Sequence, residues 1–361
     1  MKKIYIILQN GTVFEGRSFG ADGRVVGEIT FSTGMVGYLE NLTDPSNFGQ
    51  IVVSTFPLVG NYGLIEEDLQ SGKIHPKAFV VREICKDPSN YRCEGRIDSW
   101  LKENGIVGVC GVDTRAITKI LREYGNMNAV ITDTLPDPIV PDDLITHELV
   151  NPVAEVTRNT VDFYECENAK YNVALYDFGT KRDVIDSLLN IGCNVTVFPA
   201  YTPASEILGG NFDGVVLSEG PGDPKDNLKI TLELRKLFSQ LPILGIGLGH
   251  QLLAISAGAI TRKLKYGHRG ANQPVLDRVS GRVYITEQNH GYTVTHATLP
   301  VFAKIRYSNK NDNTVEGLDY EGKYAISCQF HPEANSKSRD NRVMFDRFTS
   351  LMDEFKNKEG N

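Results

Sequence analysis

The chain has 361 residues, with 38 lysines and arginines against 45 aspartates and glutamates, which gives a formal net charge of −7. At ~150 residues per domain, this length predicts two domains. The acidic balance gives no electrostatic reason to expect nucleic acid or an anionic membrane surface as a partner, so small molecules or proteins are expected instead. No apolar run approaches the ~20 residues that a membrane-spanning helix needs.

The cysteines and the first residues predict a reduced, cytoplasmic setting. The six cysteines are scattered without any C-x-x-C pair, and they are Cys85, Cys93, Cys110, Cys166, Cys193 and Cys328. The stretch from Met1 to Tyr5 leads directly into a strand pattern without a signal-peptide cleavage site.

The first half of the chain has the pattern of a β-rich domain. Residues 4–15 contain the turn signal Asn10-Gly11 between apolar runs, which predicts a β-hairpin. Further short strands are expected at 25–31, 51–55 and 78–81, and helices at 97–104 and 114–123. Asp113 is a plausible N-cap of the second helix. Thr43 to Ser46 are turn-forming residues, for which an ordinary loop is the simplest interpretation.

The composition changes between residues 133 and 172. Four prolines there interrupt helix and strand patterns, namely Pro136, Pro138, Pro141 and Pro152. We therefore predict an N-terminal domain over 1–150, a linker over 151–170 and a second domain over 171–358.

The second half alternates strands and helices. Strands are expected at 173–177, 195–198 and 214–218, and helices at 180–191 and 227–239. This alternation predicts a doubly wound α/β domain with a parallel sheet covered on both faces. Sites in such sheets gather at the carboxyl ends of the strands.

The stretch 241–254 is a short apolar run that ends in glycines and passes at once into a helical pattern. Such a turn can lift one side chain clear of the sheet, and the helix start offers N–H groups to a developing oxyanion. The segment Gly245 to Gln251 resembles the nucleophile elbow of class I glutamine amidotransferases, G-x-C-x-G-H-Q. Gly247 stands at the position of the cysteine.

Other strand ends add to this pattern. The loop 217–224 carries Gly220 and Gly222, which allow a ligand to approach the backbone closely. His331 and Glu333 lie two residues apart and share a face of an extended segment. A carboxylate that holds one imidazole nitrogen leaves the other available as a base. Each motif alone is more often an ordinary loop, and their combination and order favour a site.

Together with the first half, these motifs resemble the small subunits of carbamoyl-phosphate synthetases. Gly37-Tyr38, residues 42–46, Gly60-Asn61, residues 111–115, and residues 176–179 with Lys181-Arg182 carry this resemblance. It implies a β-rich N-terminal α+β domain followed by a flavodoxin-like class I glutamine amidotransferase domain.

The resemblance also implies roles for individual residues. His331 would be the base, Glu333 would orient it, and Gly247 stands at the nucleophile position. The oxyanion hole would be the amides of Leu248 and Gly222. The residues around glutamine would be Ser46, Gly220, Gly222, Leu248, Gln251, Asn289, Gly291 and Tyr292.

The family works as a heterodimer with a large subunit, which binds ATP, Mg²⁺ and bicarbonate and receives the released ammonia. This chain has no P-loop, so we expect no cofactor and no metal within it. We expect the large subunit as its partner and L-glutamine as a possible ligand.

This sequence departs from the family pattern at several positions. Gly247 replaces the cysteine, Glu219 stands where asparagine is usual, and Arg269 and Gln273 stand where histidines are usual. Tyr292 is a mild change from phenylalanine. Without a thiolate no thioester forms. Cys328 lies three residues before His331, and this odd separation on a strand places it on the opposite face.

Three interpretations follow. The chain is a small subunit whose glutaminase activity is lost or very low, with free ammonia as the nitrogen source for arginine or pyrimidine synthesis. Alternatively, it is a non-catalytic, glutamine-sensing pseudoenzyme. A third interpretation is an engineered nucleophile knockout, which the additional changes at Glu219, Arg269 and Gln273 argue against.

Overall fold

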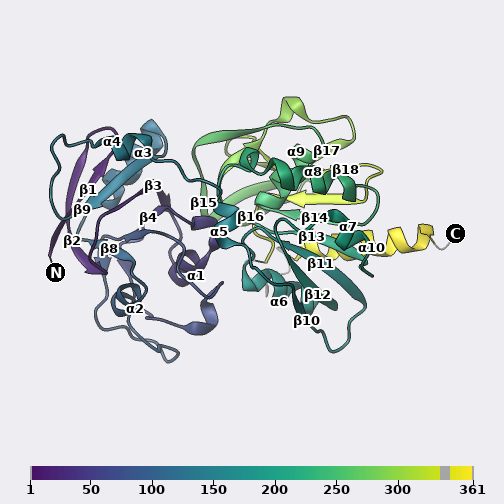
Figure 1. Ribbon diagram of the computed structural model, residues 1–361, viewed down its shortest axis with the longest axis horizontal. Helices are drawn as coiled ribbons and strands as arrows, with labels where there is room; N and C mark the ends of the chain where they lie inside the picture. The colour runs from purple at the N-terminus through teal and green to yellow at the C-terminus, as the bar shows by residue number, and fades with distance from the viewer. Residues whose placement is uncertain (1, 334–341, 360–361) are drawn as a thin grey trace. The chain divides into compact units, whose positions relative to one another are not determined.

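The computed structural model describes residues 2–333 and 342–359 (Figure 1). The chain forms two compact units, Met1–Val150 and Asn151–Asn361. In the described ranges, no helix combines the length and the apolar character needed to cross a membrane.

The first unit is built on a closed barrel whose strands follow the order β1-β2-β8-β6-β4-β3-β9 (Figure 1). The predicted hairpin is confirmed, because β1 and β2 pair antiparallel and Lys3 lies opposite Arg17. The strands of this unit are β1 Lys3–Leu8, β2 Val13–Gly20, β3 Val25–Ser32, β4 Ile51–Ser54, β5 Leu58–Val59, β6 Ala78–Val80, β7 Glu83–Ile84, β8 Val107–Cys110 and β9 Met127–Thr132.

Helices of the first unit follow the local sequence signals in part. They are α1 Tyr38–Thr43, α2 Ile97–Glu103, α3 Thr114–Tyr124 and α4 Asp142–Thr146. Asp113 caps α3 as predicted, since its side chain accepts a hydrogen bond from the Ala116 amide at 3.0 Å. The expected loop around Ser46 is instead a 3₁₀ turn, Pro45–Asn47, in which Asp44 accepts from the Ser46 amide.

The second unit is a doubly wound α/β sheet. Its strands follow the order β10-β12-β11-β13-β14-β19-β18-β17-β15-β16, and the run from β12 to β19 is parallel. The strands are β10 Asp162–Tyr164, β11 Tyr171–Asp177, β12 Cys193–Pro199, β13 Gly214–Leu217, β14 Ile243–Ile246, β15 Thr261–Asp277, β16 Val283–Val294, β17 Ala303–Asn309, β18 Val315–Tyr320 and β19 Ala325–Cys328.

Helices pack on both faces of this sheet, as the alternating pattern predicts. They are α5 Pro152–Val156, α6 Arg182–Asn190, α7 Ala204–Leu208, α8 Leu228–Leu237, α9 Leu248–Ser256 and α10 Val343–Glu359. One apolar core contains Leu234 of α8 and Leu252 of α9, and a separate core contains Leu188 of α6 and Phe348 of α10. Burial on both faces explains the nearly continuous apolar runs of the central strands.

Residues 151–170 differ from the expected linker, because they form part of the second unit. The short strand β10 pairs antiparallel with β12, with Phe163 opposite Thr196. Pro152 stands in the first turn of α5, where a missing N–H costs little. The prolines therefore shape this segment without separating it from the sheet.

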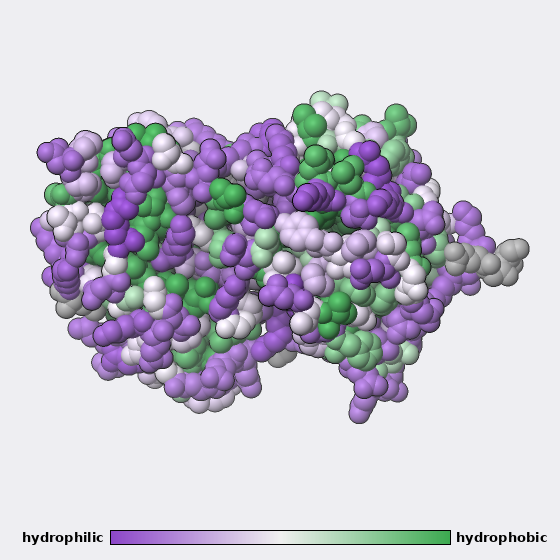
Figure 2. Space-filling model, in the orientation of Figure 1, coloured by the Kyte–Doolittle hydropathy of each residue, from purple (hydrophilic) through white to green (hydrophobic). Residues whose placement is uncertain are grey.

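The sequence did not predict the antiparallel part of this sheet, in which the strands follow the order β18, β17, β15 and β16. Along β16, residues 284, 286, 288 and 290 are buried and alternate with more exposed ones, so one face of this strand points inward. The visible surface in Figure 2 is mostly hydrophilic with scattered apolar side chains, which is ordinary for folded domains.

Candidate active site

The centre of the site is the turn between β14 and α9. Gly247 caps the helix with φ 56° and ψ −112°, as the sequence predicts for a strand-to-helix turn. Its N–H donates to the Cys328 carbonyl at 2.9 Å, which fixes the turn against β19. Leu248 is the first residue of α9, so its N–H belongs to the helix start that has no intrahelical acceptor.

A side chain at position 247 would meet resistance. An ideal Cβ on Gly247 would lie 2.9 Å from the Cβ of Glu219, and the positive φ is unfavourable for any residue with a side chain. The turn therefore stores strain whenever a non-glycine residue occupies it. Glycine avoids this strain.

Glu219 is fully enclosed beside this turn. The side chain is 1% exposed, and its Oε1 accepts a hydrogen bond from the Lys181 amide at 2.9 Å. Its Oε2 has no hydrogen-bond partner. Burial, and then the nearby charge of Glu333, raises the pKa of Glu219 well above its ordinary value of 4.5. A neutral carboxyl group is therefore favoured next to Gly247.

The imidazole side of the site is a compact charged network. Nδ1 of His331 lies 3.0 Å from Oε1 of Glu333, and Nζ of Lys181 lies 2.5 Å from the same oxygen. Both His331 and Glu333 are buried. Burial acts to raise the pKa of the Glu333 carboxyl, but Lys181 and His331 outweigh it and lower that pKa.

This network sets the tautomer of His331. With Nδ1 3.0 Å from the Glu333 carboxylate, a proton on Nδ1 is favoured, and the lone pair of the neutral ring is then on Nε2. That arrangement matches the predicted pairing of a base with an orienting acid. Lys181 is a third member that the sequence argument did not include as a site residue. Its position four residues after the end of β11, at a strand's carboxyl end, was the available signal.

The loop after β13 needs glycine at both predicted positions. A Cβ on Gly220 would lie 2.3 Å from the Phe178 carbonyl oxygen, so only glycine fits against that backbone. Gly222 has φ 91°, and a Cβ there would meet Pro152 at 2.4 Å. The loop is thus held close to β11 and to the start of α5.

Strand β16 is hydrogen-bonded both to α9, which follows the Gly247 turn, and to the segment that carries His331. The side-chain amide of Gln251 on α9 donates to the Tyr292 carbonyl and to Oε1 of Gln329, both at 2.8 Å. The His331 amide donates to the Glu287 carbonyl at 3.0 Å. Asn289 and Gly291 lie on β16 between these two attachment points, so the second unit gathers these predicted positions around α9 and His331.

The remaining predicted residue, Ser46, belongs to the first unit. It is 6% exposed and lies in the 3₁₀ turn after α1.

Two protein families match this chain, one within each unit. Residues 6–131 match the family described as carbamoyl-phosphate synthase small chain, CPSase domain, and residues 174–351 match glutamine amidotransferase class-I. The carbamoyl phosphate synthase small chain of Clostridium perfringens is 47% identical over 349 residues, which cover 96% of this chain and 98% of that protein. The small chain of Syntrophotalea carbinolica is 43% identical over 375 residues, with 99% and 100% covered.

The chain belongs to the carbamoyl-phosphate synthase small chain family. A further relative, named a pyrimidine-specific small chain in Halalkalibacterium halodurans, is 41% identical over 365 residues, with 99% of each chain covered. The second unit is accordingly the class I glutamine amidotransferase domain of a small chain.

Cys328 is the thiol that this small chain carries next to the turn, and it faces away from the site chemistry. Its Sγ donates to the Phe330 carbonyl at 3.4 Å, and the residue is fully buried in the core that contains Phe348. Burial raises the pKa of the Cys328 thiol well above its ordinary value. Because the thiolate is the nucleophilic form, this cysteine is chemically inert.

Proposed function

We propose that this chain is the small subunit of a carbamoyl-phosphate synthase in which glutamine hydrolysis is lost or very low, and that the complex uses free ammonia. The observation that carries the proposal is Gly247 at the apex of the β14–α9 turn, where no thiol is available. Membership of the small-chain family supports the partner, because a small chain implies a large one.

The chemical argument rests on what remains around the turn. Glutamine hydrolysis by this domain type needs a thiolate that attacks the amide carbon, a base that takes the thiol proton, and N–H donors for the oxyanion. His331 with Glu333 supplies the base, and the start of α9 supplies donors. Hydrolysis would then depend on a water activated by His331, and losing a covalent route costs on the order of 10⁴–10⁶ in kcat.

The binding side of the site supports retention of glutamine. The glycines at 220 and 222 and the attachment of Gln251 to β16 are in place, and these positions would surround the ligand together with Leu248, Asn289, Gly291 and Tyr292. The ATP-dependent chemistry would belong to the large subunit, so this chain would contribute no cofactor of its own.

The test is ammonia release from glutamine by the purified chain, with and without a large subunit, beside His331→Asn as the matched control. We expect no release above that control, and carbamoyl phosphate formation by the complex from ammonia but not from glutamine. Glutamine-dependent turnover that His331→Asn abolishes would refute the proposal. A chain that binds glutamine in calorimetry but forms no complex with the large subunit would favour the glutamine-sensing role instead.

A further inference from the structure

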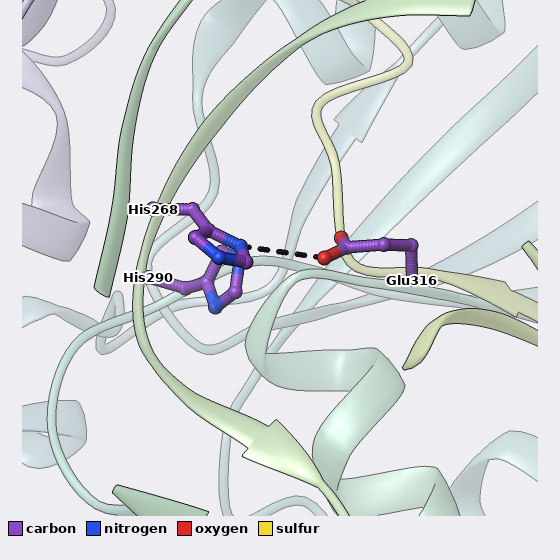
Figure 3. A group of neighbouring side chains, drawn as sticks. All are labelled: His268, His290 and Glu316. Atoms are coloured by element: carbon purple, nitrogen blue, oxygen red, sulfur yellow. Dashed lines mark ion pairs between the residues drawn. The ribbon is translucent and has the colours of Figure 1, made fainter. Parts of the chain in front are cut away.

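A second cluster of chemistry-bearing side chains lies on the antiparallel extension of the sheet. His268 of β15 lies directly opposite His290 of β16, and Glu316 of β18 faces them (Figure 3). One possible ligand atom from each of the three residues lies within 4.8 Å of the others. The exposed fractions are 7% for His268, 8% for His290 and 0% for Glu316.

In each of the two histidine rings, the nitrogen that points away from the cluster already has a hydrogen-bond acceptor. Nε2 of His268 lies 2.9 Å from Oδ2 of Asp312, and Nδ1 of His290 lies 2.7 Å from the Tyr292 carbonyl oxygen. Both acceptors require a proton on the nitrogen that faces them. When a ring held in this way is neutral, its remaining lone pair points inward, which is the usual support behind metal-binding histidines.

The inner atoms do not form a satisfied hydrogen-bond network. Oε1 of Gln288 lies 2.9 Å from Nε2 of His290 and 3.1 Å from Nδ1 of His268. Two ring nitrogens therefore converge on a single amide oxygen, which can only accept hydrogen bonds. Oε1 of Glu316 accepts a hydrogen bond from the Thr314 hydroxyl at 2.9 Å and lies 3.3 Å from Nδ1 of His268, whereas Oε2 has no hydrogen-bond partner.

Turning the Gln288 amide over moves the conflict to the Thr286 hydroxyl, which would have to give up the Gln273 carbonyl. Its nitrogen donates at 3.2 Å to Oγ1 of Thr286, and that hydroxyl already donates to the Gln273 carbonyl at 3.0 Å. The reversed amide would place its oxygen against a hydroxyl whose proton is used elsewhere. A cation between these atoms satisfies all the inward acceptors at once.

We propose that His268, His290 and Glu316 form a structural zinc site, with the Gln288 amide oxygen or a water as the fourth ligand. Two imidazole nitrogens and a carboxylate are a donor set that Zn²⁺ prefers, and four ligands complete its tetrahedral geometry. The charges also balance, because Glu316 inside and Asp312 behind His268 supply two negative charges for a divalent ion.

The position of the site suggests what the metal does. It joins β15, β16 and β18, three strands whose side chains at this point are polar and cannot pack as an apolar core. His290 is flanked in the chain by Asn289 and Gly291, so the ion would fix the part of β16 that borders the glutamine position. The proposal concerns the fold of this strand and is independent of glutamine hydrolysis.

The competing occupant is a proton on His268, held between Asp312 and Glu316 without any metal. The test is the metal content of the full chain after dialysis against zinc and removal of loosely bound ions, measured by elemental analysis. We expect one zinc per chain in the wild type, and loss of that zinc in Glu316→Gln and in His268→Asn. His296→Asn, which removes an exposed histidine of the same unit, should keep it.

Two further readouts on the wild type keep the proposal open to refutation even if a variant fails to fold. Zinc in ~100-fold excess over its dissociation constant should raise Tm by about 5–10 °C over the chelator-treated chain. Co²⁺ substituted for zinc should give the intense visible absorption of a tetrahedral site. Wild-type protein that retains no zinc and shows no Co²⁺ spectrum would overturn the proposal and leave the proton as the occupant.

Discussion

The two sides of the candidate active site differ in what they have kept. The turn at Gly247 has the backbone shape of a tight strand-to-helix turn and carries no side chain. The side formed by His331, Glu333 and Lys181 keeps its side chains in a tight, buried network.

This difference shows that the two sides depend on different interactions. The turn is shaped by main-chain contacts, such as the bond from the Gly247 amide to β19, and these do not depend on the side chain at 247. The charged network depends on every one of its members, because each buried charge is compensated by the others. A replacement at the turn should therefore cost less stability than a replacement in the network.

The largest effect is expected when the missing group is returned. Gly247→Cys should raise ammonia release from glutamine by about 10³–10⁵ and make it sensitive to alkylation. The free energy of unfolding should fall by ~1–3 kcal/mol, because the residue takes a positive φ and its Cβ approaches Glu219.

Gly247→Ala is the matched control for this change, since it adds the strain without the thiol. It should lose similar stability in urea titrations and gain no activity. His331→Asn in the cysteine background should abolish the activity again. A correctly folded but silent cysteine variant would show that the network side is less complete than its geometry suggests.

The next effect concerns the network. Lys181→Met leaves Glu333 buried beside His331 without its ammonium partner, which should cost ~3–5 kcal/mol of unfolding free energy. Lys229→Met, which removes an exposed lysine on α8, should change stability by less than ~0.5 kcal/mol. Adding Glu333→Gln to Lys181→Met should recover part of the lost stability. Losses that simply add would contradict the coupling between Lys181 and Glu333.

A smaller effect concerns the pH dependence of stability, to which Glu219 contributes. Because the pKa of Glu219 is raised above 4.5 in the folded chain, the unfolded chain loses this proton first as the pH rises. The contribution of Glu219 to stability therefore falls from about pH 4.5 up to its raised pKa.

Glu219→Gln keeps the shape of the side chain and removes its ionisable carboxyl group. It should raise the free energy of unfolding at neutral and alkaline pH by on the order of 1–3 kcal/mol, and leave it nearly unchanged near pH 4.5. Glu103→Gln, at an exposed position of α2, is the control and should change stability by less than ~0.5 kcal/mol. Urea titrations across pH check this, and parallel curves for wild type and Glu219→Gln would exclude the raised pKa.

The smallest effect is expected at Tyr292. Its carbonyl oxygen accepts hydrogen bonds from Gln251 and His290, and Tyr292→Phe leaves that carbonyl in place. Stability should change by less than ~0.5 kcal/mol, and glutamine affinity by less than about twofold. Calorimetry with glutamine checks the second figure. A tenfold loss would show that the hydroxyl itself contacts the ligand.

The sequence by itself determined the features that depend on neighbouring residues. The hairpin at Asn10-Gly11, the Asp113 cap and the glycine turn at 247 each follow from the conformational preferences of a few adjacent residues. The alternation of apolar strands and helices likewise predicted the doubly wound sheet, because burial on both faces leaves a periodic record in the chain.

Only the tertiary structure decided which distant residues meet. Lys181 contacts Glu333 across 152 positions, and Glu219 reaches the Lys181 amide across 38. The barrel closes because β9 pairs with β1, and the pairing of β15 with β16 brings His268 opposite His290. Strand register and long-range packing set these contacts, and local preferences carry no information about either.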